Sequence, residues 1–345
     1  MNRIIFSLVL ILLIATRQNA YAQTGIDKHQ QFASLGNFPL ENGQQIMDCK
    51  IGYRTFGKLN AERSNVVIYP TGGGGTTSMY ESFFGMGMDV DTTRFYLILI
   101  DALGNGVSSS PSNSVRQPKT QFPQFSIKDM VNSQHKMLVE NLAIHHLAAV
   151  VGGSMGGMQA LQWAVSYPDF MDKVVSIEGT PKFSFYDLLW TNAYIKSAKN
   201  DTAYHGGNYT VNPVLPMAAL ITQLVIMTPA FLNNAMPADS FSTWLASTER
   251  NPFNVDCNNM LWQIKACMVQ DLSSTAGGSM ENTAKMIKAK MLIIANKQDH
   301  MINQALSIKF AGMANAELVV MDNDAGHLIF NDKIPIEATR KFLSP

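Results

Sequence analysis

Short runs rich in Val, Ile and Leu recur along the chain, with turn residues such as Gly, Asn and Asp at or near their ends. Between them lie longer stretches with apolar residues at helical spacing, such as residues 130–142 and 157–165. Unbroken apolar runs are typical of strands buried on both faces, and their alternation with helices predicts a mostly parallel sheet flanked by helices. The predicted strands are residues 65–69, 95–101, 147–152, 173–177, 290–295 and 317–321.

The stretch from residue 181 to residue 285 departs from this pattern, because it contains no clear strand run. One strand–helix–strand unit needs about 30 residues, far fewer than the chain that separates the strand runs at 173–177 and 290–295. We therefore expect a helical cap, residues 181–285, inserted into a core domain made of residues 23–180 and 286–345. The methionines scattered through the cap are consistent with ordinary helix packing or with an adaptable acyl-binding wall.

Residues 1–22 have the pattern of a secretory signal peptide. Arg3 gives a positive start, residues 4–15 are an apolar run, and residues 20–22 read Ala-Tyr-Ala, a small-residue cleavage site. A membrane anchor needs about 20 apolar residues, and Arg17 interrupts this run too early. We therefore expect an exported protein, periplasmic or secreted, without an integral membrane segment in the mature chain.

Charge and cysteine content argue against two classes of partner. The chain has 26 Lys plus Arg and 26 Asp plus Glu, and no dense basic run, so nucleic acid is not an expected partner. Its three cysteines lack the CxxC spacing of a zinc site, so no metal is expected. Cys257 and Cys267, ten residues apart in the predicted cap, are open to two interpretations, a disulfide or two buried thiols.

A serine flanked by glycines marks the most informative position. Gly152-Gly153-Ser154-Met155-Gly156 follows the predicted strand 147–152 and precedes a predicted helix. This is the context of a nucleophile elbow, where the serine sits on a strained strand-to-helix turn and the glycines let neighbouring backbone pass. The pattern predicts an α/β-hydrolase fold with Ser154 as its nucleophile.

A serine hydroxyl is a weak nucleophile at neutral pH, so it needs a base and an acid that orients the base. Asp299 follows the predicted strand 290–295, and His327 lies in a glycine-containing loop after the last predicted strand. The order Ser154, Asp299, His327 is that of the α/β-hydrolases. We therefore predict these three residues as the catalytic triad.

The oxyanion hole should combine two backbone N–H groups. Met155 opens the helix after the nucleophile, where the helix dipole also favours negative charge. The second donor should come from the loop after strand 65–69, and because Pro70 has no N–H, either Thr71 or Gly72 must supply it. The glycines of this loop lack the GK[ST] ending of a phosphate-binding loop, and residues 104–106 lack a full dinucleotide fingerprint, so no cofactor is expected.

Two segments resemble the homoserine O-acetyltransferases, a family of α/β-hydrolases. Residues 151–164 read VGGSMGGMQALQWA, similar to that family's nucleophile segment, and Phe122-Pro123 with residues 127–131 (IKDMV) and Gln134 resembles a stretch upstream of it. The resemblance covers about residues 48–333. It implies Ser154 as acyl acceptor, His327 as base, Asp299 as orienting acid, a helical lid over the site, and the possibility of a homodimer.

Departures from the family fall at positions that bind the amino acid. In the family an Asp that helps to hold homoserine follows the catalytic His, whereas Leu328 stands here. The family's lid helix carries an Arg for the substrate carboxylate, whereas the matching stretch from Trp190 to Tyr194 has none. We therefore place the substrate-binding positions at Leu328, Trp190 and Tyr194. A buried amino acid would leave its charges poorly paired there, which is costly.

These observations favour hydrolysis of a small or medium acyl ester through an acyl-serine. Acetyl-CoA is a cytoplasmic metabolite that an exported enzyme would rarely meet, whereas water is always present. Acyl transfer to an alcohol such as homoserine is the alternative, with water excluded by the lid. A non-catalytic binding protein with the same fold is a third interpretation, which a complete triad argues against.

Overall fold

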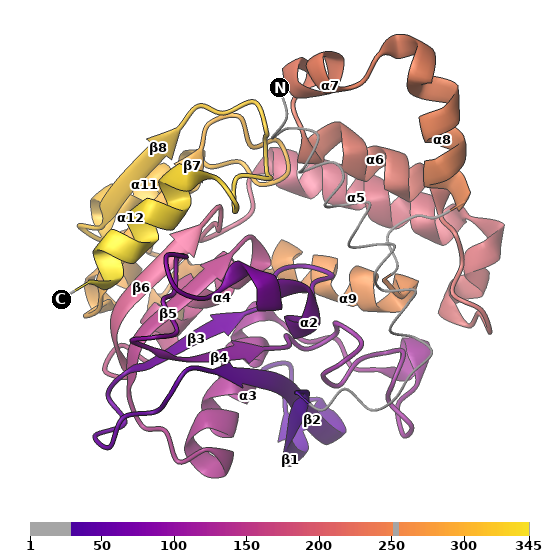
Figure 1. The fold of residues 1–345 in the computed structure, drawn as a ribbon. Coiled ribbons are helices and arrows are strands. Elements are labelled where there is room, and N and C mark those ends of the chain that lie inside the picture. Colours follow the sequence, from indigo (N-terminus) through magenta and orange to yellow (C-terminus); the bar gives the residue numbers. More distant parts are fainter. Residues whose placement is uncertain (1–28, 251–254, 345) are drawn as a thin grey trace.

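The computed structural model describes residues 29–250 and 255–344, so the predicted signal peptide lies outside the described residues. Its centre is one eight-stranded sheet with the order β1-β2-β4-β3-β5-β6-β7-β8 (Figure 1). The strands are β1 (Gln31–Pro39), β2 (Gln45–Phe56), β3 (Val66–Pro70), β4 (Tyr96–Ile100), β5 (Leu147–Gly153), β6 (Met171–Ile177), β7 (Lys290–Asn296) and β8 (Glu317–Met321).

The six strands from β3 to β8 correspond to the six predicted runs and pair in parallel. The antiparallel strands β1 and β2 were not predicted, because their burial alternates with exposed positions and gives no unbroken apolar run. They extend the sheet beyond β4. The predicted fold class, a mostly parallel sheet flanked by helices, is confirmed.

Alternate residues of the central strands enter two separate cores, one on each face of the sheet. Ile68 and Val150 face a core that includes Trp163 of α4, whereas Val67 and Val151 face a smaller core that includes Phe342 of α12. The described α-helices outside the segment between β6 and β7 are α2 (Thr77–Tyr80), α3 (Ile127–Lys136), α4 (Met155–Ser166), α11 (Ala305–Met313) and α12 (Lys333–Leu343).

Between β6 and β7 the described chain is mainly helical. Figure 1 shows α5 to α8 standing together beyond one end of the sheet, with α9 between them and the sheet strands. Ser184 and Asp187 form a capping box that begins α5. The helices are α5 (Phe185–Asn200), α6 (Pro216–Ile226), α7 (Pro229–Ala235), α8 (Phe241–Arg250), α9 (Cys257–Met268) and α10 (Met280–Met286).

The positions of Cys257 and Cys267 on helix α9 distinguish between a disulfide and two buried thiols. Cys257 and Cys267 are both buried free thiols on this one helix. A helix rises about 1.5 Å per residue, so ten residues separate their Cα atoms by about 15 Å, well beyond the reach of a disulfide. The structure therefore contradicts a bridge between them.

One further property of the helices concerns membranes. Within residues 29–250 and 255–344, no single helix is both long and apolar enough to cross a bilayer, and one bent pair, α6 with α7, passes the length and composition test.

Candidate active site

Ser154 occupies a strained turn between β5 and α4. Its backbone has φ 56° and ψ −126°, a region that residues with a side chain rarely adopt. The flanking glycines are required by space, because a Cβ on Gly156 would lie 2.5 Å from the Pro70 carbonyl oxygen, and one on Gly152 would overlap the Gly156 carbonyl. The turn thus has the geometry predicted for a nucleophile elbow.

Three predicted side chains meet at this turn. His327 Nε2 lies 2.8 Å from Ser154 Oγ, and His327 Nδ1 lies 2.8 Å from Asp299 Oδ2. The other carboxylate oxygen of Asp299 accepts the backbone N–H groups of Met301 and Ile302. Asp299 and His327 are both buried, so the hydrogen bond between them is sheltered from water.

The two candidates for the second oxyanion donor differ in their hydrogen bonds. The Thr71 N–H donates to the Ile100 carbonyl at 3.0 Å and is therefore already engaged. The Gly72 N–H donates to the Tyr80 hydroxyl at 3.3 Å, a long bond that a developing anion can replace. Met155 is the first residue of α4, so its N–H has no acceptor within the helix. Met155 and Gly72 are thus the available pair.

Residues 70–76, the oxyanion loop, are held in place from two sides. The Gln263 side chain on α9 accepts the Gly74 N–H at 2.8 Å and donates to the Leu103 carbonyl at 3.0 Å. Asn105 donates to the Gly75 carbonyl at 3.0 Å. A helix of the segment 181–285 therefore helps to fix the loop that carries a predicted oxyanion donor.

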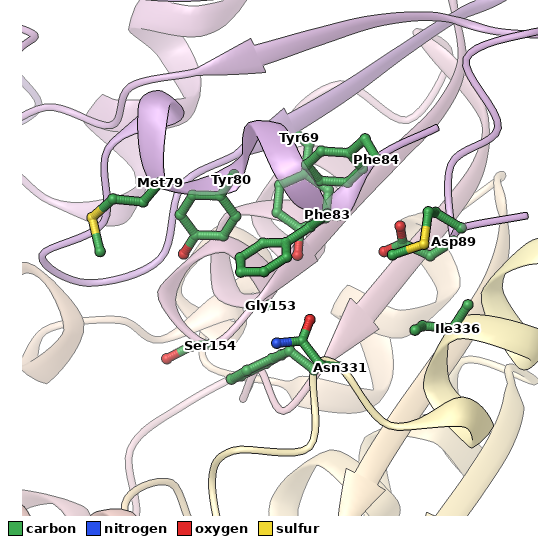
Figure 2. Close-up of a pocket in the computed structure, with 12 residues that line it drawn as sticks. Tyr69, Met79, Tyr80, Phe83, Phe84, Asp89, Gly153, Ser154, Asn331 and Ile336 are labelled. Carbon is green, nitrogen blue, oxygen red and sulfur yellow. The ribbon is translucent and has the colours of Figure 1, made fainter. Parts of the chain in front are cut away.

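A cavity of about 190 Å³ opens beside Ser154. Figure 2 shows Tyr80, Phe83 and Phe84 above Ser154, with Asp89 at the far side of the view. Burial raises the pKa of the Asp89 carboxyl from 3.8 to about 6. The lining residues are mostly aromatic or aliphatic: Tyr69, Met79, Tyr80, Phe83, Phe84, Met88, Asp89, Gly153, Ser154, Phe330, Asn331 and Ile336.

A second carboxyl group adjoins the predicted triad. Glu178 follows β6 directly, is fully buried, and places Oε2 3.5 Å from His327 Nδ1. Burial, and then the charge of Asp299, raise the pKa of Glu178 well above its ordinary value. One ligand atom each from Glu178, Asp299 and His327 lies within 4.8 Å of the others, as in a metal site. The direct 2.8 Å contact between His327 and Asp299 is a hydrogen bond, so we interpret these two residues as a hydrogen-bonded pair with Glu178 beside it.

The three predicted substrate-binding residues lie elsewhere. Trp190 and Tyr194 are neighbours on α5, and neither they nor Leu328 line the cavity beside Ser154. The Trp190 indole N–H donates to the Met301 carbonyl at 2.8 Å, so this side chain supports the loop that carries Asp299. Substrate contacts by these three residues stay a prediction.

The sequence reasoning missed Tyr80, Asp89 and Glu178. Glu178 carried a usable signal, because it ends the apolar run 173–177 at the edge where parallel strands collect functional residues. Tyr80 ends the four-residue helix α2, and Asp89 lies in the irregular chain that follows it, and no periodicity in the sequence specifies the path of this segment between β3 and β4.

Comparison with known proteins places this geometry in context. The sequence model of one protein family, described as the alpha/beta hydrolase fold, matches residues 65–334 of this chain. An ethyl acetate hydrolase of Pseudomonas veronii is 32% identical over 86% of this chain and 89% of that protein. A homoserine O-acetyltransferase of Acidiphilium cryptum is 29% identical over 88% of this chain and 91% of that protein. The structure of an acetylester hydrolase from Corynebacterium glutamicum superimposes with a TM-score of 0.83 at 26% identity, covering 91% of this chain and 95% of the other.

Proposed function

The chain belongs to the α/β-hydrolase fold family, in the branch that contains esterases and homoserine O-acetyltransferases, and we propose that it hydrolyses a compact acyl ester through an acyl-serine on Ser154. The relationship predicted from residues 151–164 is thereby confirmed. One observation carries the proposed mechanism: hydrogen-bond distances of 2.8 Å link Ser154 to His327 and His327 to Asp299. This is the arrangement that activates a serine hydroxyl.

In the proposed acylation step, Ser154 Oγ attacks the ester carbonyl while its proton passes to His327 Nε2. Asp299 accepts a hydrogen bond from the Nδ1–H group and stabilises the imidazolium. The N–H groups of Met155 and Gly72 receive the negative charge that develops on the carbonyl oxygen. The attack forms a tetrahedral intermediate. Its collapse breaks the ester C–O bond, and His327 gives the proton to the departing alcohol.

Deacylation repeats these events with water as nucleophile. Water gives one proton to His327 Nε2 and attacks the acyl-serine carbonyl, and the carboxylic acid leaves as Ser154 recovers its proton. The two steps together consume one water molecule per ester and use no cofactor.

The cavity beside Ser154 supports a compact substrate. Its volume of about 190 Å³ is only somewhat larger than a cavity of about 150 Å³ that accommodates benzene. Its largely apolar lining suits an acyl or alcohol group without charge. The names of two similar proteins, an ethyl acetate hydrolase and an acetylester hydrolase, support acetyl as the acyl group.

The proposal is tested with purified protein and an activated acetyl ester, with and without homoserine. We expect free acetate as the product in both reactions and no turnover by Ser154→Ala. Labelling of Ser154 by a fluorophosphonate would identify the nucleophile directly. Failure of labelling together with undiminished hydrolysis by Ser154→Ala would exclude the proposed mechanism.

Acyl transfer is a second candidate, because homoserine O-acetyltransferases are among the similar proteins. The two reactions share the proposed triad and differ in the group that attacks the acyl-serine. Leu328 supplies no charge for a bound amino acid, which favours water. Substantial O-acetylhomoserine in the assay would favour transfer, and formation of this product only by Leu328→Asp would identify this position as the determinant.

We also propose that the enzyme is exported. The support is the sequence of residues 1–22, which lie outside the described residues. Fractionation of cells that express the full chain should place the protein outside the cytoplasm with its N-terminus at Gln23. A variant lacking residues 2–22 should stay in the cytoplasm, and equal distribution of the two forms would refute export by this segment.

A further inference from the structure

Glu178 is a buried acid without a hydrogen-bond partner for its side chain. Its residue is fully buried, and both carboxyl oxygens lack a hydrogen-bond partner within the described part of the chain. Its backbone has φ 51°, a left-handed conformation that is uncommon for a residue other than glycine. A buried carboxyl group without partners costs free energy, so its position calls for an explanation.

Glu178 lies beside His327, the proposed catalytic base. Glu178 Oε2 is 3.5 Å from His327 Nδ1, and Asp299 Oδ2 is 2.8 Å from the same nitrogen. Asp299 also receives hydrogen bonds from two backbone N–H groups and from the Gln304 side chain. Two acids thus face one imidazole nitrogen. Asp299 accepts several hydrogen bonds, whereas the Asn296 backbone N–H is the one donor that lowers the pKa of Glu178, too weakly to offset its burial.

The surroundings of Glu178 disfavour its charged form. The titratable groups that face Glu178 are His327, Asp299 and Asp332. Burial raises the pKa of Glu178 most, and the charges of Asp299 and Asp332 raise it further. These effects favour the neutral form of Glu178 beside Asp299.

We infer that Glu178 is a second positioning residue for His327, which can accept the Nδ1–H group when Asp299 no longer does. The inference rests on the proposed function of Ser154. In the wild-type enzyme Glu178 keeps its own proton, while the Ser154 proton moves to His327 Nε2 and the Nδ1 proton stays bonded to Asp299.

Replacement of Asp299 by Asn exposes this second role. Loss of the Asp299 charge removes one cause of the raised pKa of Glu178, so Glu178 releases its proton to solvent at a lower pH than before. Its carboxylate then accepts the Nδ1–H group and keeps the histidine in the tautomer that can take the serine proton. An enzyme with a single orienting acid loses about 10⁴-fold in kcat on such a change, because the tautomer is wrong.

The test measures kcat/KM against pH for the wild type, Glu178→Gln, Asp299→Asn and the double variant. We expect Asp299→Asn to lose only about 10²-fold at alkaline pH, with activity that rises as Glu178 ionises. The double variant should lose about 10⁴-fold and lack that rise. The isosteric Glu178→Gln alone keeps Asp299 as the orienting acid, so a loss as large as that of the double variant would contradict the inference.

Asp332→Asn is the matched control, because it removes another acid near Glu178 that does not contact His327. Combined with Asp299→Asn, it should leave the rise with pH in place. Melting temperatures identify any variant that fails to fold. Equal activities and pH profiles of Asp299→Asn and the double variant, with Ser154→Ala inactive, would overturn the inference and leave the proposed function standing. An active Ser154→Ala would overturn both.

Discussion

The side-chain oxygen of Gln263 accepts the Gly74 N–H at 2.8 Å, which ties helix α9 to the oxyanion loop across the chain. Gln263 is almost fully buried, so this bond is sheltered from water. A helix of the segment between β6 and β7 therefore contacts the loop that carries the proposed oxyanion donor through a specific hydrogen bond.

Replacing Gln263 by Leu should weaken both stability and catalysis. The Gly74 N–H and the Leu103 carbonyl would lose their partners, and an unsatisfied buried group costs about 1–3 kcal/mol. A loosened oxyanion loop should lower kcat at least about 10-fold. Gln270→Leu is the control for ester kinetics and urea unfolding, because Gln270 is equally buried and bonds Gln162 instead. An unchanged kcat in Gln263→Leu would contradict the role of the bond.

Ser154 should show a trade-off between stability and activity. Ser154→Gly removes the nucleophile and also relieves the positive φ, so we expect a gain of about 1 kcal/mol in the free energy of unfolding. Ser154→Ala keeps a Cβ and should stay close to the wild type in stability. Both should lose at least about 10⁴-fold in ester hydrolysis. Equal unfolding free energies of the two variants would show that the turn stores no strain.

Asp89 should make stability fall as pH rises. Its folded-state pKa of about 6 exceeds the ordinary 3.8, so between these values the folded protein retains a proton that the unfolded chain releases. The resulting loss on going from about pH 4 to pH 7 is up to about 3 kcal/mol. Asp89→Asn should therefore gain stability over the wild type at pH 7 and little at pH 4. Urea unfolding at both values measures this, with the exposed Asp239→Asn as control.

Gly156 should not tolerate a methyl group. A Cβ there would lie 2.5 Å from the Pro70 carbonyl oxygen, at the start of the oxyanion loop. We expect Gly156→Ala to cost about 1–3 kcal/mol in stability and about 10²-fold in kcat through displacement of the loop. Gly312→Ala on α11 has no atom within 4 Å of its Cβ and should be neutral or slightly stabilising. Thermal unfolding and ester kinetics compare the two, and similar effects would refute the argument.

Much of this protein follows from local sequence. Unbroken apolar runs identified the six parallel strands. For β3, β4, β5 and β7 the reason is burial on both faces, which leaves almost no position for a polar residue, whereas the apolar run of the edge strand β8 is largely exposed. Strand ends and their turn residues identified Ser154, Asp299 and His327 as neighbours, because the carboxyl ends of parallel strands meet at one edge of the sheet. The half-exposed strands β1 and β2 left no such run and were missed.

Other features depend on contacts between distant segments. The sequence allowed either Thr71 or Gly72 as oxyanion donor, and only the pairing of β3 with β4 commits the Thr71 N–H to Ile100. It also placed Glu178 at the functional edge of the sheet without specifying its contact with His327, and it held no signal for the contact of Gln263 with Gly74. Periodicity and turn chemistry act over a few residues, so they determine which elements form and where they end. The packing of those elements against one another determines which side chains meet, and with that the partner and charge state of each buried polar group.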